Sequence, residues 1–413
     1  MYSENNLDKY YQYLLAFLFF FVTISVFISK LFIVLITLIW FFSGIYKLKI
    51  SSVFSNSISV ASIAFFIWLA FSLLWTENLS WGLRMLANMI EFAILIPILL
   101  SILRYENFRI YLYAFIMGVI FSLVLILLDY SGFKVALGFG KFTSKTPLMS
   151  SISQGIFFAF AIFISLNEIY QRLNSNSSSK AVFLFWVPLL LILIFILFDS
   201  DSRAGQIGAL VAYFVFFIKK FKFRNFLILF FATTLTTVTI SYLYSNNFKT
   251  RVDRIYTETK DHLDGRYEST SIGQRLYWYD KSIEIINDNF WLGVGIGDYK
   301  ENLTELMKFD KTSIQSHTNP HNMYLLIFAS TGFIGLLLFL NLFFIIIHKS
   351  LIEKNNTKSI YGLFLGLLFL TIMLSDSYLL GHYTQTLFVL MLAGIFSKPF
   401  MSNNEDFSNY SKI

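Results

Sequence analysis

One long polar stretch interrupts an otherwise apolar chain of 413 residues. It covers residues 244–322 and reads YSNNFKTRVDRIYTETKDHLDGRYESTSIGQRLYWYDKSIEIINDNFWLGVGIGDYKENLTELMKFDKTSIQSHTNPHN. The chain as a whole is 56% hydrophobic and only 14% charged, whereas soluble proteins carry about 25% charged residues. We therefore predict that residues 245–322 form a soluble lobe, here called the polar lobe, carried on a bundle of membrane-spanning helices.

Twelve apolar runs flank the polar lobe, and each predicts a membrane-spanning helix, because about 20 apolar residues cross the hydrocarbon core. The expected fold is an all-α integral membrane protein with nine spans in residues 1–244, the polar lobe in 245–322, three spans in 323–400 and a cytoplasmic tail in 401–413. The first run lacks a basic region and a cleavage site, which indicates a retained span rather than a signal peptide. The runs cover roughly 13–29, 31–46, 57–75, 86–103, 108–128, 151–167, 181–199, 204–219, 225–244, 323–347, 360–380 and 384–400.

Basic residues predict how the chain is oriented, because Lys and Arg gather in cytoplasmic loops of membrane proteins. With the N-terminus in the cytoplasm, the inside segments hold far more Lys and Arg than the short outside segments, and the dense cluster Lys219–Arg224 falls inside. The polar lobe then lies outside. The net charge of +7 has this origin and is no sign of nucleic-acid binding. The chain has no cysteine, which excludes disulfides and thiolate metal sites.

The middle of the polar lobe carries two local patterns. A three- and four-residue apolar spacing in Gln274–Asn287 predicts an amphipathic helix, lying on the membrane surface or on the bundle. The run Gly293–Gly297, GVGIG, resembles a phosphate loop, but no strand–loop–helix context surrounds it. A turn that brings the backbone close to the bundle is the better interpretation. The spaced apolar residues are Leu276, Tyr279, Ile283 and Ile286.

Two arginines are candidates for binding an anion. Arg203 follows Asp199-Ser200-Asp201-Ser202 at an expected helix start, and Arg275 opens the amphipathic helix. A helix N-terminus with a guanidinium group makes a good phosphate pocket. The alternative for Arg203 is an ion pair with Asp199 or Asp201. Further arginines on the same predicted face also favour an anionic ligand: Arg84, Arg251, Arg254 and Arg266.

The end of the polar lobe, His317-Thr-Asn-Pro-His321-Asn322, is the strongest candidate for chemistry. Histidine gains and loses a proton near neutral pH, so His321 is the natural base for a hydroxyl nucleophile. Zinc binding is disfavoured, because Pro320 argues against a helix that would align the two histidines, and no acid or cysteine stands close by in the sequence. We therefore predict no metal site.

Three features inside or beside the spans have more than one interpretation. Glu91 lies within a span, where an acid is either paired or functional. Thr331-Gly332-Phe-Ile-Gly335 is typical of close helix packing. Asp376 lies near the outer boundary, where it can interact with the candidate site.

These features together resemble the O-antigen ligase/polymerase family. The layout of twelve spans, a Ser-Arg pair at an outer helix start and one large late loop matches that family. His321-Asn322, followed after nine residues by Gly332-Phe-Ile-Gly335, is similar to the pattern of O-antigen ligases. Arg275-Leu-Tyr-Trp with Trp291-Leu-Gly-Val-Gly-Ile-Gly resembles the family's loop segment. The motifs cover about residues 198–335, and the first six spans match in topology only.

The resemblance implies a GT-C-like membrane glycosyltransferase of the bacterial inner membrane, with its active site facing the periplasm. The implied donor is a glycan on undecaprenyl diphosphate. A ligase moves it to a sugar hydroxyl of lipid A-core in lipopolysaccharide biosynthesis, and a polymerase moves it to another repeat unit. Neither uses a nucleotide sugar, and the ligase works without a metal ion, so we expect no cofactor. The expected partners are the lipid-linked glycan, the lipid A-core acceptor and membrane lipids.

The resemblance also implies roles for single residues. Arg203 and Arg275 would hold the diphosphate, and His321 would accept the proton of the attacking hydroxyl. Ligases of the family carry an Arg-x-x-x-Leu motif in the loop, and no loop arginine here has leucine four residues later. The sequence therefore leaves open which loop arginine binds diphosphate, and whether the chain is a ligase or a polymerase. Supporting roles are expected for Ser202, His317, Asn322 and Asp376.

Two other classes of protein fit the sequence less well. A transporter of lipid-linked sugars needs charged or polar groups near the bilayer midplane, whereas these spans are nearly free of charge and the candidate residues gather on one face. A structural membrane scaffold would leave the arginines and histidines unexplained.

Overall fold

The computed structural model describes residues 4–44, 46–103, 105–132, 148–175, 180, 182–263, 270–308, 310 and 314–397. Within these residues every regular element is a helix, as predicted. The predictions for the tail 401–413 and for Arg266 concern residues outside this set.

The α-helices in chain order are α1 (Glu4–Phe21), α2 (Val26–Phe42), α3 (Tyr46–Ser55), α4 (Ser57–Phe71), α5 (Leu79–Asn88), α6 (Ile90–Ala93), α7 (Leu95–Ile102), α8 (Phe108–Tyr130), α9 (Ser151–Asn174), α11 (Val187–Asp199), α12 (Arg203–Lys220), α13 (Phe223–Tyr244), α14 (Asn246–Leu263), α15 (Ser271–Asp288), α16 (Tyr299–Met307), α17 (Met323–Ile352), α18 (Asn356–Ile372) and α19 (His382–Phe396). Short helical turns of other types cover η1 (Ser72–Trp75), η2 (Tyr105–Asn107), η3 (Val182–Trp186) and η5 (Tyr378–Leu380).

Several helices are long and apolar enough to cross a membrane, which fits a multi-pass membrane protein. Among the described residues six helices meet this condition by length and composition, or seven if the bent α5–α7 segment counts as one span. The predicted twelve spans are therefore not established. Five predicted spans account for the difference: α2, α18 and α19 are apolar but shorter than 18 residues, and α1 and α12 do not meet the condition of length and composition either. The six are 57–75, 105–129, 151–174, 182–199, 223–244 and 323–352.

The first predicted span, 13–29, is wrong in its boundaries. Helix α1 ends at Phe21, and a turn separates it from α2. The side chain of Ser25 accepts a hydrogen bond from the Ile28 N–H at 3.4 Å and so caps the start of α2. The apolar pattern hides this break because the residues on both sides of the turn are equally apolar.

The predicted span 86–103 is also broken. It consists of α6, α7 and the end of α5, and the α5–α7 segment bends by 51°. Glu91 lies in this break, is 5% exposed and forms an ion pair with Lys30 of α2. Of the two interpretations that the sequence left open for Glu91, the paired one holds.

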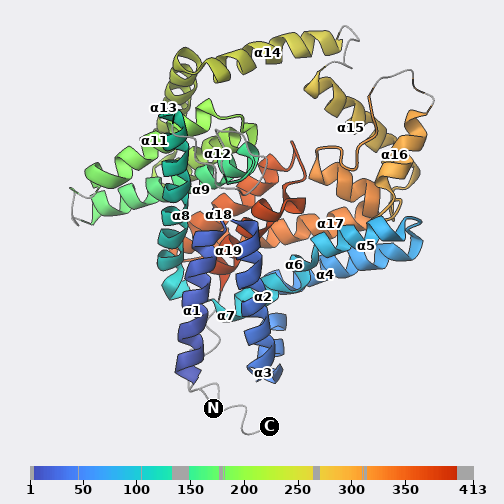
Figure 1. Cartoon of the computed structure of the whole chain (residues 1–413), viewed down its shortest axis with the longest axis horizontal. Coiled ribbons are helices and arrows are strands. Elements are labelled where there is room, and N and C mark those ends of the chain that lie inside the picture. Colours follow the sequence, from blue (N-terminus) through green and yellow to red (C-terminus); the bar gives the residue numbers. More distant parts are fainter. Residues whose placement is uncertain are drawn as a thin grey trace.

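The centre of the bundle is built from closely packed helices. Figure 1 shows α18 and α19 at the centre, with α9 and α12 beside them. A Cβ atom on Gly205 of α12 would overlap the backbone of Gly155 of α9, so small residues allow these two backbones to touch. Helix α19 is buried almost along its whole length.

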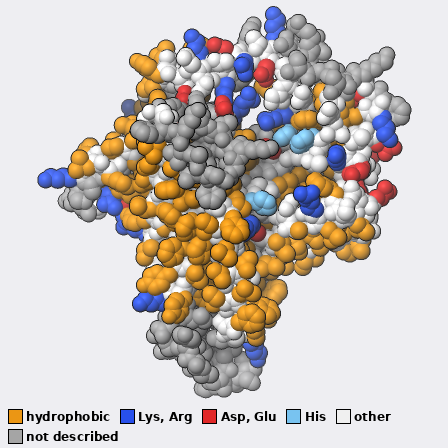
Figure 2. Space-filling model, viewed as in Figure 1, with side chains coloured by type: hydrophobic (Ala, Val, Ile, Leu, Met, Phe, Trp, Pro, Cys, Tyr) orange, Lys and Arg blue, Asp and Glu red, His pale blue; other side chains and the backbone are white. Residues whose placement is uncertain are grey.

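The polar lobe lies at one end of the bundle, here called the lobe end. Helices α14 and α15 run across the top of Figure 1. Figure 2 shows charged side chains concentrated around this end, whereas apolar side chains cover most of the opposite half. Charged and apolar side chains are thus separated along the molecule, and the division into a solvated lobe and a lipid-embedded bundle stays a prediction.

Helix α15 confirms the predicted amphipathic helix and the burial of Ile286, but most of its buried face is shifted from the predicted one. Tyr277, Trp278 and Ile285 are buried, whereas Ile283 is 46% exposed. The polar tips of the two aromatic side chains find acceptors inside the lobe: the Tyr277 hydroxyl donates to Asp310 at 2.5 Å, and the Trp278 ring N–H donates to a backbone carbonyl at 3.2 Å. Aromatic residues with a satisfied polar tip are readily buried, and the apolar spacing alone does not show this.

The glycine turn docks on a break in α17. Gly332 has a φ of 69° and is non-helical inside α17. Gly295 donates its backbone N–H to Ser330 at 2.9 Å, and Phe333 donates to Phe290 at 2.8 Å. The predicted close approach of the glycine turn is thus confirmed. Helix packing alone does not explain Gly332, because a Cβ there would overlap the backbone of Trp291. Gly335 does pack beside Trp68 of α4, as a packing glycine should.

Candidate functional site

The candidate site is centred on His321, the residue just before the cap of α17. Its φ of 57° is left-handed, which is rare for a residue other than glycine. The backbone is held on both sides: its N–H donates to Asn319 Oδ1 at 2.8 Å, and its carbonyl accepts the Tyr279 hydroxyl at 3.1 Å. This conformation is therefore imposed by its surroundings, which is typical of functional positions.

The His321 ring is bonded to an acid from another part of the chain. Its Nδ1 lies 3.1 Å from Oδ1 of Asp376, in the turn between α18 and η5. The two side chains are 24% and 23% exposed, so the pair is half-buried but open on one side. Because Nδ1 is occupied, Nε2 is the ring nitrogen available to a substrate.

Asn319 connects the two halves of this pair. Its Nδ2 donates to Asp376 Oδ1 at 3.3 Å, and its Oδ1 accepts the Ser377 hydroxyl at 2.9 Å as well as the His321 N–H. The Ser377 backbone N–H also donates to Asp376 Oδ1, at 2.7 Å. One amide side chain thus fixes the acid, the histidine and the turn that carries the acid.

Three rings form a stack beside the site. The His317 and His321 rings lie 4.9 Å apart at 27°, and Trp278 of α15 lies 5.5 Å from the His321 ring. The His317 Nδ1 atom lies 2.9 Å from the Asn319 carbonyl. His317 therefore contributes to the shape of the segment, and its supporting role in the reaction stays a prediction.

Arg275 also belongs to this region of the lobe. Burial would raise the pKa of Asp376, but the hydrogen bond and charge of His321, the Ser377 N–H and the charge of Arg275 together hold it below its usual value. The charge of Arg275 also acts on the Tyr279 and Tyr378 hydroxyls. The polar lobe therefore brings Arg275 close enough to share one electrostatic environment with the His321–Asp376 pair.

Asn322 fixes the first turn of α17 and joins it to the acidic turn. Its Oδ1 accepts the backbone N–H groups of Tyr324 and Leu325, at 3.0 and 3.2 Å, so it is the N-cap. Its Nδ2 donates to the Leu374 carbonyl at 3.3 Å, close to Asp376. Asn322 therefore joins the start of α17 to the turn that carries Asp376.

Arg203 is placed at the same end of the bundle but in a different cluster. It is exposed at the start of α12, and Ser202 is the buried N-cap whose Oγ accepts the Gly205 N–H at 3.1 Å. Helix α12 lies against α18, with Gly208 beside Leu368, so Arg203 starts near the end of α18 that leads to Asp376. No described contact joins Arg203 to His321, Asp376 or Arg275.

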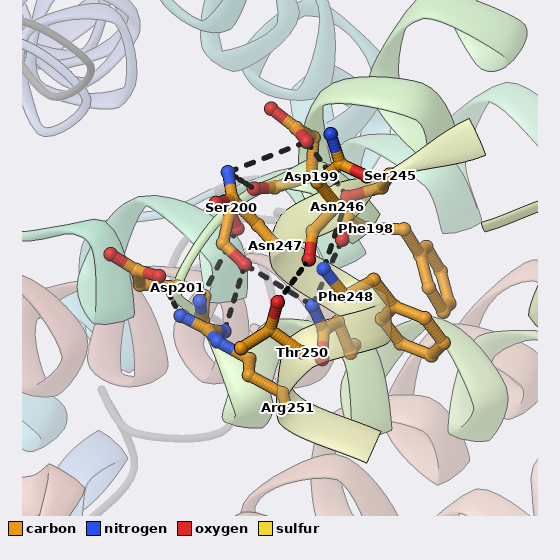
Figure 3. A network of polar contacts seen from close by, with 12 residues as sticks. Phe198, Asp199, Ser200, Asp201, Ser245, Asn246, Asn247, Phe248, Thr250 and Arg251 are labelled. Atoms are coloured by element: carbon orange, nitrogen blue, oxygen red, sulfur yellow. Dashed lines mark hydrogen bonds and ion pairs between the residues drawn. The ribbon is translucent and has the colours of Figure 1, made fainter. Parts of the chain in front are cut away.

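The alternative interpretation of Arg203, an ion pair with Asp199 or Asp201, does not hold in the structure. Figure 3 shows that Asp201 pairs with Arg251 of α14, which also donates to the Ser200 carbonyl at 3.0 Å. Asp199 accepts the Ser245 hydroxyl at 2.8 Å. Arg251 of the polar lobe thus pairs with Asp201, one of the two acids that were candidates for pairing with Arg203. Arg203 is exposed.

Sequence reasoning missed several residues of the site. Asn319 stands inside the quoted histidine motif, and Ser377 directly follows Asp376. Tyr279 was expected only as an apolar position of the amphipathic helix, yet its hydroxyl binds the carbonyls of His321 and Leu374, each at 3.1 Å. Their roles depend on contacts between segments distant in sequence, which a single sequence does not reveal.

Part of the chain matches a known protein family. Residues 188–340 match the model of the family described as O-Antigen ligase. The matched region begins in α11 and includes Arg203, Arg275 and His321, as well as the glycine turn and the break in α17, while Asp376 follows it. No curated protein matches the chain. The family match agrees with the resemblance that the motifs indicated: residues 188–340 of this chain are similar to the O-antigen ligase family.

Proposed function

We propose that the protein is an O-antigen ligase, which transfers a polysaccharide from undecaprenyl diphosphate to a sugar hydroxyl of lipid A-core. The reaction would take place at the periplasmic face of the bacterial inner membrane, as a step in lipopolysaccharide biosynthesis. The family match over residues 188–340 supports a lipid-linked glycan as substrate. The observation that carries the proposal is the His321–Asp376 pair, which shares its surroundings with Arg275.

The pair supports a proton transfer during glycosyl transfer. An acceptor hydroxyl attacks the anomeric carbon of the donor glycan; the new C–O bond forms while the bond from that carbon to the diphosphate oxygen breaks. His321 Nε2 takes the hydroxyl proton, and the ionised Asp376 at Nδ1 holds the ring and stabilises the imidazolium that forms. The diphosphate leaves with the electron pair of the broken bond.

The arginines supply the positive charge that the leaving group requires. A guanidinium group binds two phosphate oxygens at once, and charge placed where the transition state becomes negative lowers the barrier. Arg275 is half-buried next to the acid–histidine pair. Arg203 is exposed at the start of α12, where the helix N-terminus also favours an anion.

Replacement of His321 tests the proposed base. His321→Ala should abolish transfer in a purified assay, because it removes the ring nitrogen that is proposed to take the proton from the acceptor hydroxyl. His348→Ala is the matched control, since His348 lies near the far end of α17, about 40 Å along the helix from the His321 end. Near-normal turnover of folded His321→Ala protein would contradict the assignment.

O-antigen polymerase is the alternative that the family leaves open. The two activities differ only in the acceptor, so lipopolysaccharide gels of a deletion strain distinguish them. Loss of a ligase leaves lipid A-core bare while polymer collects on the carrier, whereas loss of a polymerase leaves core capped with one repeat unit. A normal ladder would exclude both functions.

A further inference from the structure

The segment that leads into the glycine turn exposes large apolar side chains. Phe290, Trp291 and Leu292, here called the apolar tip, are 40%, 64% and 47% exposed. Residues 289–297 read NFWLGVGIG and contain no charged residue. Although the tip belongs to the polar lobe, clustered exposed apolar side chains of this kind mark contact with a partner or a membrane.

Contacts with α4 and α17 place the apolar tip beside two potential spans. A Cβ atom on Gly332 of α17 would overlap the Trp291 carbonyl. One residue earlier on α17, the Thr331 carbonyl accepts the ring N–H of Trp68 of α4 at 3.0 Å. Trp68 lies within the potential span 57–75 and precedes the end of that span by about 10 Å of helix. The apolar tip therefore lies alongside α4 well inside the end of this span.

The chain after the tip returns to the end of α4. Both carboxylate oxygens of Asp298 accept backbone N–H groups just beyond the span, from Glu77 and Asn78, each at 2.8 Å. A Cβ atom on Gly297 would lie 2.4 Å from the Asn78 carbonyl oxygen. The segment thus runs along α4 with its apolar residues inside the span and its charged residue, Asp298, at the end of it.

The apolar tip continues the exposed apolar surface of α17. The rings of Phe290 and Trp291 lie 5.5 and 5.9 Å from the ring of Phe333. Phe333 is 36% exposed, and Leu337, one turn further along α17, is 54% exposed. Residues 323–352 are themselves a potential span. The tip and the outer surface of this span would therefore contact the same solvent, which is lipid if α17 crosses the membrane.

Backbone groups of the segment are paired as a membrane requires. Non-helical backbone is tolerated at membrane depth only where its polar groups are bonded within the protein. The Val294 N–H donates to the Ala329 carbonyl at 2.9 Å. The Phe333 N–H donates to the Phe290 carbonyl at 2.8 Å. The break in α17 therefore supplies bonding partners that allow an irregular turn to lie among spanning helices.

We propose that the apolar tip is inserted into the membrane on the lobe side, where it anchors the polar lobe to the lipid. Tryptophan and phenylalanine suit this position, because amphipathic aromatic rings gather at the boundary between hydrocarbon and headgroups. Since the tip follows α15 directly, the anchor would set the height of Arg275 above the bilayer. The inference concerns contact with lipid and does not depend on the proposed function.

A fluorescent label at the tip tests its surroundings. The chain has no cysteine, so Leu292→Cys can carry a single nitrobenzoxadiazole label while Trp291 stays in place. The full chain would be placed in phosphatidylcholine nanodiscs that contain lipid with a doxyl quencher high on the acyl chain. This lipid should quench the label at least about threefold more strongly than a label on Lys300→Cys, an exposed site on α16. Aqueous iodide should show the reverse order.

Two outcomes of this measurement would overturn the insertion. One is equal quenching of both labels by the doxyl lipid, which would show that the tip lies in water. The other is protection from iodide without quenching by lipid, which would show that protein covers the tip, for example a second copy of the chain.

Replacement of Trp291 tests its part in the anchor. In folded Leu292→Cys protein, the added change Trp291→Asp places a charge at the boundary and should reduce quenching by the doxyl lipid about twofold or more. Ile283→Asp is the matched control, because Ile283 is 46% exposed in the same lobe but lies on α15, and it should leave the quenching unchanged. Equal losses in both variants, or no loss in Trp291→Asp, would contradict the role of Trp291.

Discussion

His321 combines a reactive ring with a constrained backbone. A left-handed φ costs a residue with a side chain about 1–3 kcal/mol, and here φ is 57°. Two hydrogen bonds offset that cost: the His321 N–H donates to Asn319 Oδ1, and the Tyr279 hydroxyl donates to the His321 carbonyl. The same geometry turns the ring between Trp278 and Asp376. The site is therefore organised before any substrate arrives, as catalytic positioning requires.

Asn319 should be the most sensitive residue that the sequence did not single out. Asn319→Ala removes the contacts to the His321 N–H, Ser377 and Asp376 at once. We expect transfer to fall by about 10²-fold, since small misplacements of catalytic groups have effects of this size. Steady-state assays should show the loss mainly in kcat. Thr318→Ala changes the adjacent residue and should retain activity; equal losses in both variants would argue for general damage to the segment.

Asp376 should affect both activity and acid stability. Asp376→Asn removes the charge opposite Nδ1, and we expect transfer to fall by about 10²- to 10⁴-fold. The pKa of Asp376 is held below its usual value, mainly by His321 against the opposing effect of burial. The carboxylate therefore stabilises the fold above its unfolded pKa, and this contribution is lost as pH falls through the lower folded pKa.

Thermal unfolding at several pH values measures that contribution. Asp376→Asn should melt below the wild type between about pH 5 and 8, where the carboxylate is ionised, and the gap should narrow below about pH 4. A gap that grows on acidification would contradict the assigned direction of the shift.

At the residue scale, the sequence identified the residues with distinctive chemistry. His321, Asn322 and Arg275 stand in short motifs whose residue types imply their use, and Asp376 was recognised as an acid near the same boundary. Asn319 and Tyr279 were missed because their importance comes from hydrogen bonds to segments up to 95 residues away. No periodicity or spacing carries that information.

Among the elements, α17 departs most from a regular helix. The break at Gly332 frees backbone groups that the glycine turn then pairs with, including Gly295 to Ser330 and Phe333 to Phe290. The Trp68 side chain of α4 donates to the Thr331 carbonyl at 3.0 Å. Because the turn follows α15 directly, this docking fixes where α15 places Arg275 and Trp278 against the start of α17.

Gly332→Ala should undo that docking. A Cβ at this position would overlap the Trp291 backbone, and the φ of 69° is itself unfavourable for alanine. We expect a loss of stability of about 2 kcal/mol or more and reduced activity, measured by thermal melts and transfer assays. The control Gly366→Ala adds a Cβ to α18, where the nearest atom is a side-chain carbon at 3.0 Å, and should have a small effect. Similar melts for both variants would show that the break does not need glycine.

The elements were predicted well where hydropathy is decisive. Residues 57–75 and 223–244 are helices close to the predicted bounds. The breaks at 22–25 and 89–94 were missed, because hydrogen-bond geometry interrupts a helix there without any change in hydropathy. The buried face of α15 was misassigned by about one residue, since satisfied aromatic tips outweigh simple apolar spacing.

On the scale of the whole molecule, the sequence predicted a polar lobe on an apolar bundle, and in the structure charged side chains gather around the lobe end (Figures 1 and 2). The number of spans could not be predicted from hydropathy alone. Helices α18 and α19 are apolar because their neighbours bury them, so their apolar character does not show that they are long enough to cross the bilayer. The sequence also could not show that α15, the start of α17 and the turn after α18 lie together, because this depends on how the helices pack.

The orientation of the molecule in the membrane is still a prediction from charge, and the chain lends itself to a direct test because it contains no cysteine. Lys300 of α16 and Lys354 between α17 and α18 are both exposed, and they lie on opposite predicted sides. A membrane-impermeant maleimide added to intact spheroplasts should label Lys300→Cys and spare Lys354→Cys, which should react only after the membrane is opened. The two variants control for each other, because both replace an exposed lysine and differ only in predicted side. Labelling of Lys300→Cys alone would agree with a transfer reaction on the periplasmic face. The reverse pattern would place the His321–Asp376 pair on the cytoplasmic face and would contradict the proposed periplasmic reaction.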